Sequence, residues 1–336
     1  GDVYKRQLQV KGNLEKLLAA LHVRRHVEIQ LIFDRLIAAG DWSHVDLVAY
    51  LTKHRDLLSR HEIERLTNTA IFPRADETPA PGKPPHRYKA TQLYEPTEAL
   101  RALQLPTLAW PGRPWRASSD EARFIFALGL RRHPPLPDLL ALASAAQPDA
   151  ALRERAFAYL LRHFQEVYAG EYTLKTAARY AFVPRRAADA GEPALLPPTD
   201  VFTDAGAAVM GWPVADLAAG EALKLQLRMH PTSAQLVERL LANPPRDVEA
   251  ARRVFGFLAT TREFTGAQYA QLGKERIVPV TGKEPGRMEL AAPQECYFPP
   301  TNREGSAPFR EIFHYVDYGV AANLFLLSLI HISEPT

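Results

Sequence analysis

Arginine and histidine recur in the same order beside proline in two parts of the chain, and their side chains have the greatest capacity for chemistry. Arg131 and His133 precede one proline, and Arg228 and His230 precede another. A histidine can serve as an acid, a base or a metal ligand, and an arginine can bind an anion through paired hydrogen bonds. Cations followed by proline are also typical of a helix C-terminus. We favour the helix end and keep a repeated peptide-binding position as the alternative.

Trp115, with Arg113 and Arg116 beside it, is a second candidate, because an aromatic ring next to basic side chains can hold single-stranded nucleic acid. The charge of the chain argues against that function, since 41 basic and 38 acidic residues give a formal net charge of only +3. A dedicated nucleic-acid-binding protein is usually more basic. We therefore expect protein partners or clients, and nucleic acid is the alternative partner.

Catalytic and cofactor motifs are missing from the sequence. It has no phosphate-binding loop, no dinucleotide-binding glycine pattern and no nucleophile elbow. His22 and His26 are one helical turn apart, but no third metal ligand is near them in sequence. Asp317 begins a turn that we expect to lead into a helix, and the single cysteine, Cys296, is typical of a small core residue. We expect no catalytic, cofactor-binding or metal-binding residues. The candidate interaction residues are Arg131, His133, Arg228, His230 and Trp115.

The composition is that of a globular, intracellular chain. Hydrophobic residues make up 46% and charged residues 24%, which excludes a disordered or fibrous protein. A single cysteine excludes a disulfide framework, and no apolar run reaches the roughly 18 residues that a membrane span needs. The 28 prolines must lie between short elements, because proline breaks helix interiors and central strands.

Local patterns predict helices and their starting points. The helices that apolar spacing predicts cover residues 14–38, 44–58, 136–146 and 149–168. Two Ser-x-x-Glu patterns predict capping boxes, one made by Ser59 with Glu62 and the other by Ser118 with Glu121.

The most informative feature of the sequence is an internal repeat. The pattern Leu-x-Leu-Arg-x-His-Pro occurs at residues 128–134 and again at 225–231. An apolar run that ends in proline occurs three times, and its prolines are Pro73, Pro184 and Pro279. A second extended piece follows each of these prolines and contains Tyr94, Phe202 or Tyr297. The order of these landmarks predicts an α+β, predominantly helical fold. It consists of tandem modules of about 100 residues, each with short strands plus a helical bundle.

The two ends read as translated sequencing adapter. One encoding of residues 1–7 is the reverse complement of one encoding of residues 327–333, and it matches the end that a transposase leaves in a sequencing library. Such segments are left out of fold reasoning. The predicted organisation is adapter at 1–7, a helical segment ending an upstream module at 8–66, module A at 67–168, module B at 169–262, a truncated module C at 263–326, and adapter at 327–336.

Several stretches of the body resemble one large fungal protein family. They are residues 27–36, 40–42, 105–110, 181–184, 241–245, 312–319 and 322–326. The family is known as domain of unknown function 3684, and the resemblance covers essentially the whole body. It implies a fungal source and a very long, sacsin-like protein with an Hsp90-type ATPase domain upstream of this region. None of the motifs of that ATPase occurs here, so the resemblance assigns no nucleotide-binding residue.

Together these observations predict a non-catalytic middle region of a large, chaperone-related protein, which acts as a scaffold or as an arm that binds partners or clients. The alternative is a scaffold that associates with nucleic acid through basic loops. An enzyme with a site formed between modules is the third hypothesis. The compartment is intracellular, and the sequence leaves cytoplasm and nucleus open.

Overall fold

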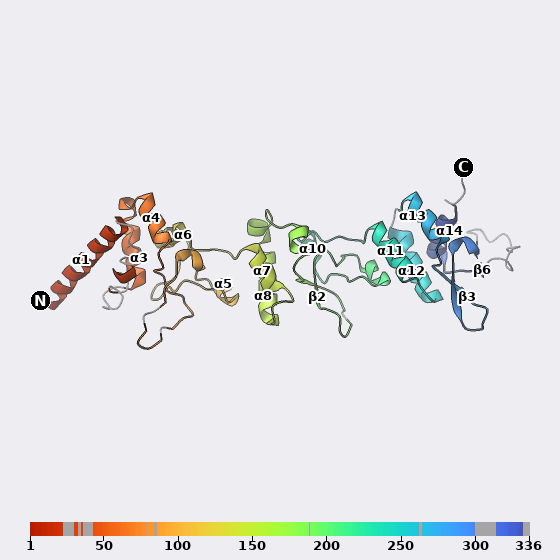
Figure 1. Ribbon diagram of the computed structural model, residues 1–336, viewed down its shortest axis with the longest axis horizontal. Coiled ribbons are helices and arrows are strands. Elements are labelled where there is room, and N and C mark those ends of the chain that lie inside the picture. Colours follow the sequence, from red (N-terminus) through yellow and green to blue (C-terminus); the bar gives the residue numbers. More distant parts are fainter. Residues whose placement is uncertain are drawn as a thin grey trace. The chain divides into compact units, whose positions relative to one another are not determined.

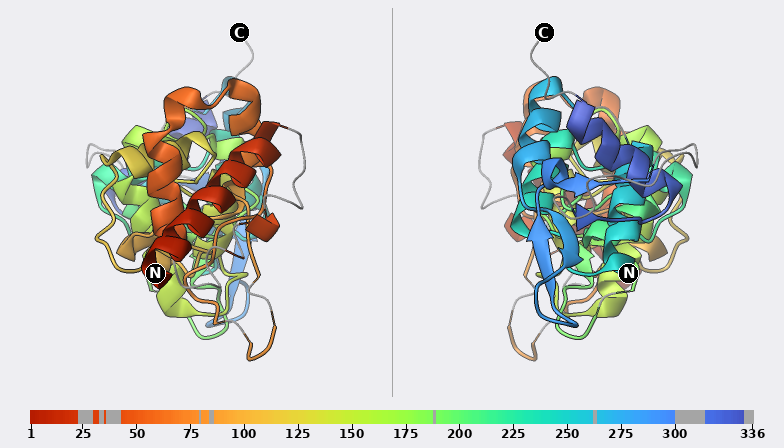
Figure 2. Two further views of the ribbon diagram at one scale, coloured as in Figure 1. Left: turned by 90° about the vertical axis from the view of Figure 1, so that its left-hand side faces the viewer. Right: turned by 90° about the vertical axis from the view of Figure 1, so that its right-hand side faces the viewer.

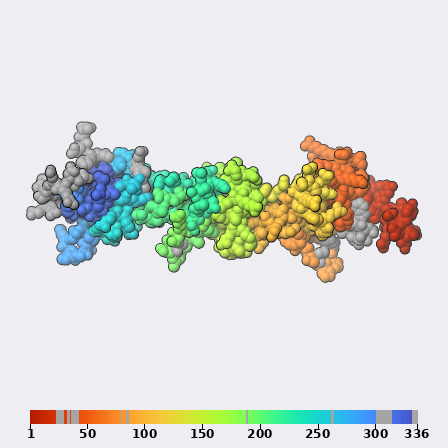
Figure 3. Space-filling model, turned by 180° about the vertical axis from the view of Figure 1, so that it is seen from behind, coloured from red at the N-terminus to blue at the C-terminus, as the bar shows by residue number. Residues whose placement is uncertain are grey.

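The computed structural model is predominantly helical, with a few short strands in small sheets, which confirms the α+β class (Figure 1). The described residues are 1–22, 30–32, 35, 43–78, 80–83, 86–187, 189–261, 264–299 and 314–331. Two compact units share the chain. Unit 1 comprises Gly1–Ala143 and Gln147–Tyr168, and unit 2 comprises Ser144–Ala146 and Ala169–Thr336. In Figure 3 unit 1 carries the red to yellow colours and unit 2 the green to blue colours.

Unit 1 is built from helices and short turns of helix. These are α1 (Asp2–His22), α3 (His44–Lys53), η1 (Arg55–Leu57), α4 (Arg60–Thr67), η2 (Ala90–Gln92), α5 (Glu98–Ala102), α6 (Asp120–Ala127), α7 (Leu136–Ala143), α8 (Ala150–Arg162) and the π-helix η3 (Phe164–Tyr168). The helices predicted over 44–58, 136–146 and 149–168 are confirmed in their main parts. Much of the predicted helix over 14–38 lies outside the described residues.

One hydrophobic core joins the first helices of unit 1 to its extended segments. Leu17 of α1 and Leu47 of α3 are fully buried with Phe72 and Leu108 of the extended chain. Leu128, at the end of α6, belongs to the same core. Burial of a leucine or phenylalanine side chain contributes about 2 kcal/mol to folding, so this core fixes the extended segments against the helices.

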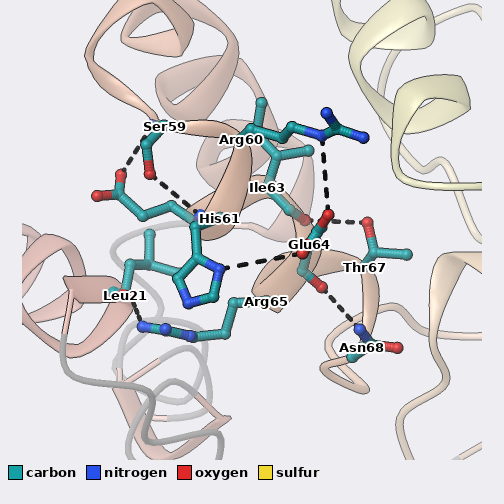
Figure 4. Close-up of polar contacts among 10 residues, drawn as sticks. Leu21, Ser59, Arg60, His61, Ile63, Glu64, Arg65, Thr67 and Asn68 are labelled. Carbon is teal, nitrogen blue, oxygen red and sulfur yellow. Dashed lines mark hydrogen bonds and ion pairs between the residues drawn. The ribbon is translucent and has the colours of Figure 1, made fainter.

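Helix starts in unit 1 follow local side-chain chemistry. The Ser59 hydroxyl accepts a hydrogen bond from the Glu62 backbone N–H, and the Glu62 carboxylate accepts one from the Ser59 N–H, so this capping box is confirmed. Figure 4 shows the polar contacts of α4, in which Arg65 also donates to the Leu21 carbonyl. The second predicted box is wrong by one residue. Ser119 caps α6 by accepting from the Ala122 N–H at 3.1 Å, so the cap is not Ser118.

Unit 2 contains the remaining elements. These are α9 (Leu174–Ala177), β1 (Val183–Pro184), β2 (Leu195–Leu196), η4 (Ala205–Met210), α10 (Ala219–Lys224), α11 (Ser233–Ala242), α12 (Val248–Thr261), α13 (Gly266–Lys274), β3 (Val278–Thr281), β4 (Met288–Ala291), η5 (Pro293–Glu295), β5 (Cys296–Tyr297), β6 (His314–Tyr315) and α14 (Val320–His331). β1–β2 and β3–β4 are antiparallel pairs, and β5–β6 is a parallel pair. The right-hand view of Figure 2 shows α14 against α12. The rings of Phe255 in α12 and Phe325 in α14 are stacked at 6.1 Å between centroids.

The extended chain of unit 1 is held by a set of backbone hydrogen bonds that we call the first frame. Tyr94 pairs in parallel with both Thr107 and Arg131. The five bonds run from Tyr94 N–H to Pro106 C=O, Leu108 N–H to Tyr94 C=O, Ala75 N–H to Thr107 C=O, Ala109 N–H to Pro73 C=O, and Glu95 N–H to Arg131 C=O, all between 2.8 and 3.0 Å.

Unit 2 contains a second frame with the same five bonds. Phe202 pairs in parallel with both Val214 and Arg228. The bonds run from Phe202 N–H to Pro213 C=O, Ala215 N–H to Phe202 C=O, Arg186 N–H to Val214 C=O, Asp216 N–H to Pro184 C=O, and Thr203 N–H to Arg228 C=O, all between 2.8 and 3.1 Å. Gly129 and Gln226 follow the helix that leads to each arginine. Both have a positive φ, 100° and 59°, which lets the chain reverse into the frame.

Candidate functional site

A buried carboxylate is the centre of the most elaborate polar cluster in unit 1. Glu95 directly follows Tyr94 in the first frame and is only 7% exposed. Its Oε1 accepts a hydrogen bond of 2.9 Å from the Trp115 indole Nε1, and its Oε2 lies 3.7 Å from Arg132 Nε. A carboxylate away from water needs such donors, because leaving one unpaired is costly. Glu95 therefore ties two later segments of the chain to the frame.

Trp115 is fixed by other aromatic rings as well as by Glu95. It lies on the segment between the frame and α6, residues 110–119, which is eight residues longer than the corresponding segment 217–218 of unit 2. Its ring meets Trp110 edge-on at 5.3 Å and Phe126 edge-on at 5.9 Å between centroids. Arg132 covers the Phe126 ring at 4.6 Å, a cation–π contact. We call Glu95, Trp115, Phe126 and Arg132 the tryptophan cluster.

The segment that carries Trp115 also contacts α3. Arg113 lies 3.4 Å from the Asp46 carboxylate, and Trp110 meets the His44 ring edge-on at 6.0 Å. His44 Nε2 bonds to the Ala109 carbonyl at 2.6 Å. Burial outweighs this hydrogen bond and lowers the pKa of His44 to about 4. The ring is therefore neutral at pH 7 and donates Nε2–H to the carbonyl.

His133 belongs to a group of stacked rings on the other side of the same motif. Its Nδ1 lies 2.5 Å from the Tyr159 hydroxyl, and the His163 ring lies 5.1 Å from it between centroids. Burial, then the nearby His163 and Arg132, lower the pKa of His133. Burial, then Glu95 and Tyr94, raise the pKa of Tyr159 to about 12. A protonated tyrosine that donates to a neutral histidine is the result, and this pair stabilises α8 against the frame.

Arg131 is exposed and makes one side-chain hydrogen bond within the frame. Its Nη1 donates to the Tyr94 hydroxyl at 3.1 Å, and the guanidinium lies 5.5 Å from the centroid of the same ring. Arg131 therefore contributes to the frame through its side chain as well as its backbone.

In unit 2 the corresponding residues have different partners. His230 Nδ1 lies 3.0 Å from the Asp204 carboxylate, whereas His133 pairs with a tyrosine hydroxyl. Arg228 is exposed. Phe202 stands where the first frame has Tyr94, and it has no hydroxyl that could accept a hydrogen bond from the arginine. Trp212 packs against Phe202 at 6.2 Å and under Arg239 at 4.3 Å. The candidate residues thus have separate partners: Trp115 contacts Glu95, Arg131 contacts Tyr94, and His133 contacts Tyr159. In unit 2 His230 lies beside Asp204, and Arg228 is exposed.

The other chemical candidates are engaged in structural contacts. Cys296 is buried, which raises the pKa of its thiol to about 12. The Asp317 carboxylate accepts from the Gly319 N–H and from Asn323 Nδ2, and these bonds lower its pKa and hold the turn that begins α14. His22 is exposed and lies 2.6 Å from Glu62. His26 lies outside the described residues. Within the described part of the chain, no three histidine, cysteine, aspartate or glutamate side chains come together to hold a metal.

Glu95 is the residue of this site that the sequence did not single out. Trp115 was proposed for its basic neighbours, yet its indole N–H is directed at a buried acid. The two residues are twenty positions apart and lie on unrelated local patterns. The one signal in the sequence is that Glu95 directly follows Leu93 and Tyr94, which were expected to form a short extended piece.

Comparison with known proteins places the chain in a family. The chain belongs to the family described as a protein of unknown function, DUF3684, whose model matches residues 3–336. No curated protein and no solved structure shows significant similarity to it. Among the described residues, no helix combines the length and the apolar character that crossing a membrane requires.

Proposed function

We propose that this chain is a non-catalytic middle region of a large sacsin-like protein and that it acts as a scaffold or client-binding arm. The observation that carries the proposal is the pair of frames, which have the same five backbone bonds but different polar side chains around them. Repeat units typically keep their backbone geometry while the surfaces that meet partners vary. This supports tandem modules, with A at 67–168 and B at 169–262.

Part of the same pattern occurs a third time. Tyr297 of β5 pairs in parallel with Tyr315 of β6, as Tyr94 pairs with Thr107. The Val316 N–H donates to the Tyr297 carbonyl at 3.0 Å, which matches the bond from Leu108 to Tyr94. These contacts support module C at 263–326.

One apolar position of the modules is suited to binding a partner. Phe126, Leu223 and Leu324 each lie two residues before a fully buried leucine. In module A, Trp115 and Arg132 pack on the Phe126 ring. In module B Leu223 is 81% exposed and Met229, which takes the place of Arg132, is 63% exposed. An uncovered apolar position that is covered in a sister module is where we place the contact with clients.

The state of the polar candidates supports a role without catalysis. His133 and Trp115 are hydrogen-bonded to the Tyr159 hydroxyl and to Glu95, and His230 Nδ1 lies 3.0 Å from the Asp204 carboxylate. Each of these pairs holds two segments of one unit together. The chaperone-related role, the Hsp90-type ATPase domain upstream, the fungal source and the intracellular location come from the family resemblance and the composition. They remain parts of the proposal, as does the adapter origin of residues 1–7 and 327–336.

The experiment measures whether the chain keeps an unfolded protein in solution without ATP. Light scattering follows the aggregation of chemically unfolded rhodanese with increasing amounts of the chain. We expect suppression near equimolar ratio and no phosphate release from ATP. The Leu223→Glu variant should need a severalfold higher concentration, because the charge removes the apolar contact.

The matched control is Leu57→Glu, since Leu57 is 69% exposed in unit 1 and lies outside the modules' shared position. Equal suppression by both variants would contradict the assignment of the client-binding position. Sustained ATP turnover by the purified chain would contradict the non-catalytic role.

Nucleic acid remains the second candidate because Arg113 and Arg116 are exposed on either side of Trp115. A fluorescent single-stranded oligonucleotide at low salt tests it. Binding that weakens steeply with salt would favour this function over client binding.

A further inference from the structure

Two large apolar side chains of unit 2, Leu223 and Met229, lie on either side of the point where α10 ends. They are 81% and 63% exposed. The Gln226 N–H donates to the Leu223 carbonyl at 3.1 Å, and the Leu227 N–H donates to the Ala222 carbonyl at 3.0 Å. These two bonds turn the chain at the end of the helix and lead it back toward the second frame.

The end of α6 in unit 1 has the same two bonds. The Gly129 N–H donates to the Phe126 carbonyl at 2.9 Å, and the Leu130 N–H donates to the Ile125 carbonyl at 3.2 Å. Across this turn the side chains of Phe126 and Arg132 are in contact, with the guanidinium carbon 4.6 Å from the ring centroid. Because the backbone turns in the same way in unit 2, Leu223 and Met229 hold the two adjacent places there. We call these two side chains the module B patch.

Unit 1 supplies its own occupant for the corresponding position. The Trp115 ring meets the Phe126 ring edge-on at 5.9 Å between centroids, and its indole N–H donates to Glu95 at 2.9 Å. Trp115 comes from residues 110–119, whereas the corresponding residues 217–218 of unit 2 are one leucine and one alanine. The segment that brings a tryptophan onto this position in unit 1 is thus reduced to two small or aliphatic residues in unit 2.

The polar acceptor that receives Trp115 also has a counterpart in unit 2. The Thr203 N–H donates to the Arg228 carbonyl at 3.0 Å, as the Glu95 N–H donates to the Arg131 carbonyl at 2.8 Å. The side chains of Thr203 and Glu95 therefore leave their frames at the same point. Thr203 is partly exposed and has a hydroxyl oxygen that can accept a hydrogen bond. An apolar patch beside a single acceptor suits tryptophan, which combines a large apolar ring with one N–H donor.

We infer that the module B patch binds a non-helical segment of a client protein that presents a tryptophan side chain. The ring packs on Leu223 and Met229, and the indole N–H donates to the Thr203 hydroxyl. The contact reproduces between two proteins the one that Trp115 makes within unit 1. The inference rests on the proposed client-binding position and adds the chemistry that is recognised there. Tryptophan is mostly buried in folded proteins and becomes accessible in unfolded ones, which is the state of a chaperone client.

Fluorescence anisotropy of a labelled peptide tests the inference on the full chain. The peptide has the sequence of residues 111–118, Pro-Gly-Arg-Pro-Trp-Arg-Ala-Ser, and contains one tryptophan. We expect saturable binding that weakens roughly tenfold when the peptide carries Trp115→Ala, because a central aromatic side chain supplies most of the energy of such a contact. Leu223→Glu in the chain should weaken binding by a similar factor. Leu57→Glu, at a side chain that is 69% exposed in unit 1, should leave it unchanged.

A second variant gains affinity and so cannot be explained by misfolding. Thr203→Glu combined with Met229→Arg gives unit 2 the carboxylate and the guanidinium that lie around Trp115 in unit 1. This double variant should bind the tryptophan peptide severalfold more tightly than the wild-type chain. Unchanged or weaker binding would overturn the assignment of position 203 as the acceptor.

Equal affinity of the chain for the two peptides would overturn the inference, and so would equal affinity of the wild type and Leu223→Glu. Suppression of rhodanese aggregation that depends on Leu223 without any binding of the peptide would leave the client-binding position in place and overturn its preference for tryptophan. Binding of the peptide without suppression of aggregation would support the inference and contradict the client-binding role. The two failures are therefore distinct.

Discussion

Unit 1 should lose stability in mild acid, and His44 should make a large contribution to that loss. Its pKa is about 4 in the folded chain, against 6.5 for an ordinary histidine. Between these pH values the His44 imidazole is protonated in the unfolded chain and neutral in the folded chain. The free energy of unfolding therefore falls as the pH falls from 6.5 to 4. A shift of this size corresponds to about 3 kcal/mol, spread at no more than ~1.4 kcal/mol per pH unit.

Urea unfolding followed by tryptophan fluorescence at pH 7, 5.5 and 4.5 measures this loss. Trp110 is a suitable reporter, because its ring meets His44 edge-on. The His44→Gln variant cannot take up the proton, so its stability should depend less on pH across this range. His61→Gln is the matched control, since the side chain of His61 is 54% exposed. If wild type and His44→Gln lose the same free energy between pH 7 and 4.5, the burial of His44 does not set its protonation and the reasoning is refuted.

Three further outcomes follow from contacts described above. Trp115→Phe should lower the free energy of unfolding by about 1–3 kcal/mol in urea titrations, because buried Glu95 loses a donor. In a Glu95→Gln background, Trp115→Phe should lower the free energy of unfolding by less. Gln226→Gly should raise the melting temperature and Gly129→Gln should lower it, because both positions have a positive φ that favours glycine. In addition, a Cβ at Gly129 would lie 2.5 Å from a Thr91 methyl group. Changes of melting temperature in the opposite directions would refute the correspondence of the two positions. The Cys296 thiol, with its pKa raised to about 12, should resist iodoacetamide at pH 8 until urea unfolds unit 2, as mass spectrometry of the intact chain can check.

Sequence reasoning succeeded where the deciding interactions are local. The capping box of Ser59 and Glu62 needs only four consecutive residues, and the structure has it. The error at the next helix shows the limit, because Ser118 and Ser119 are adjacent and either could accept from a backbone N–H three residues on. Packing of α6 against the core, with Phe124 and Ile125 buried, decides for Ser119.

The tryptophan cluster could not be predicted because its members meet only after folding. Glu95 contacts both Trp115 and Arg132, and these two residues lie on separate segments that no local sequence pattern links to Glu95. The repeated Arg-x-His-Pro motif, in contrast, was visible as a pattern. What the pattern could not give is that the arginine acts through its backbone, by pairing with the residue before and the residue after an aromatic side chain.

That pairing has a consequence for how copies of the unit can be recognised. The bonds that define a frame come from the main chain, so they constrain residue spacing and the proline and positive-φ positions far more than residue identity. Tyr94 and Phe202, or Glu95 and Thr203, can replace one another at the same point of the frame. Eight residues can also be added before α6 without breaking any of its bonds. The sequences of the copies can therefore diverge until no significant pairwise identity is left. The spacing and the proline and positive-φ positions would still be kept. In relatives of this chain, the distance from an apolar proline to Arg-x-His-Pro is a better guide to further copies than sequence identity.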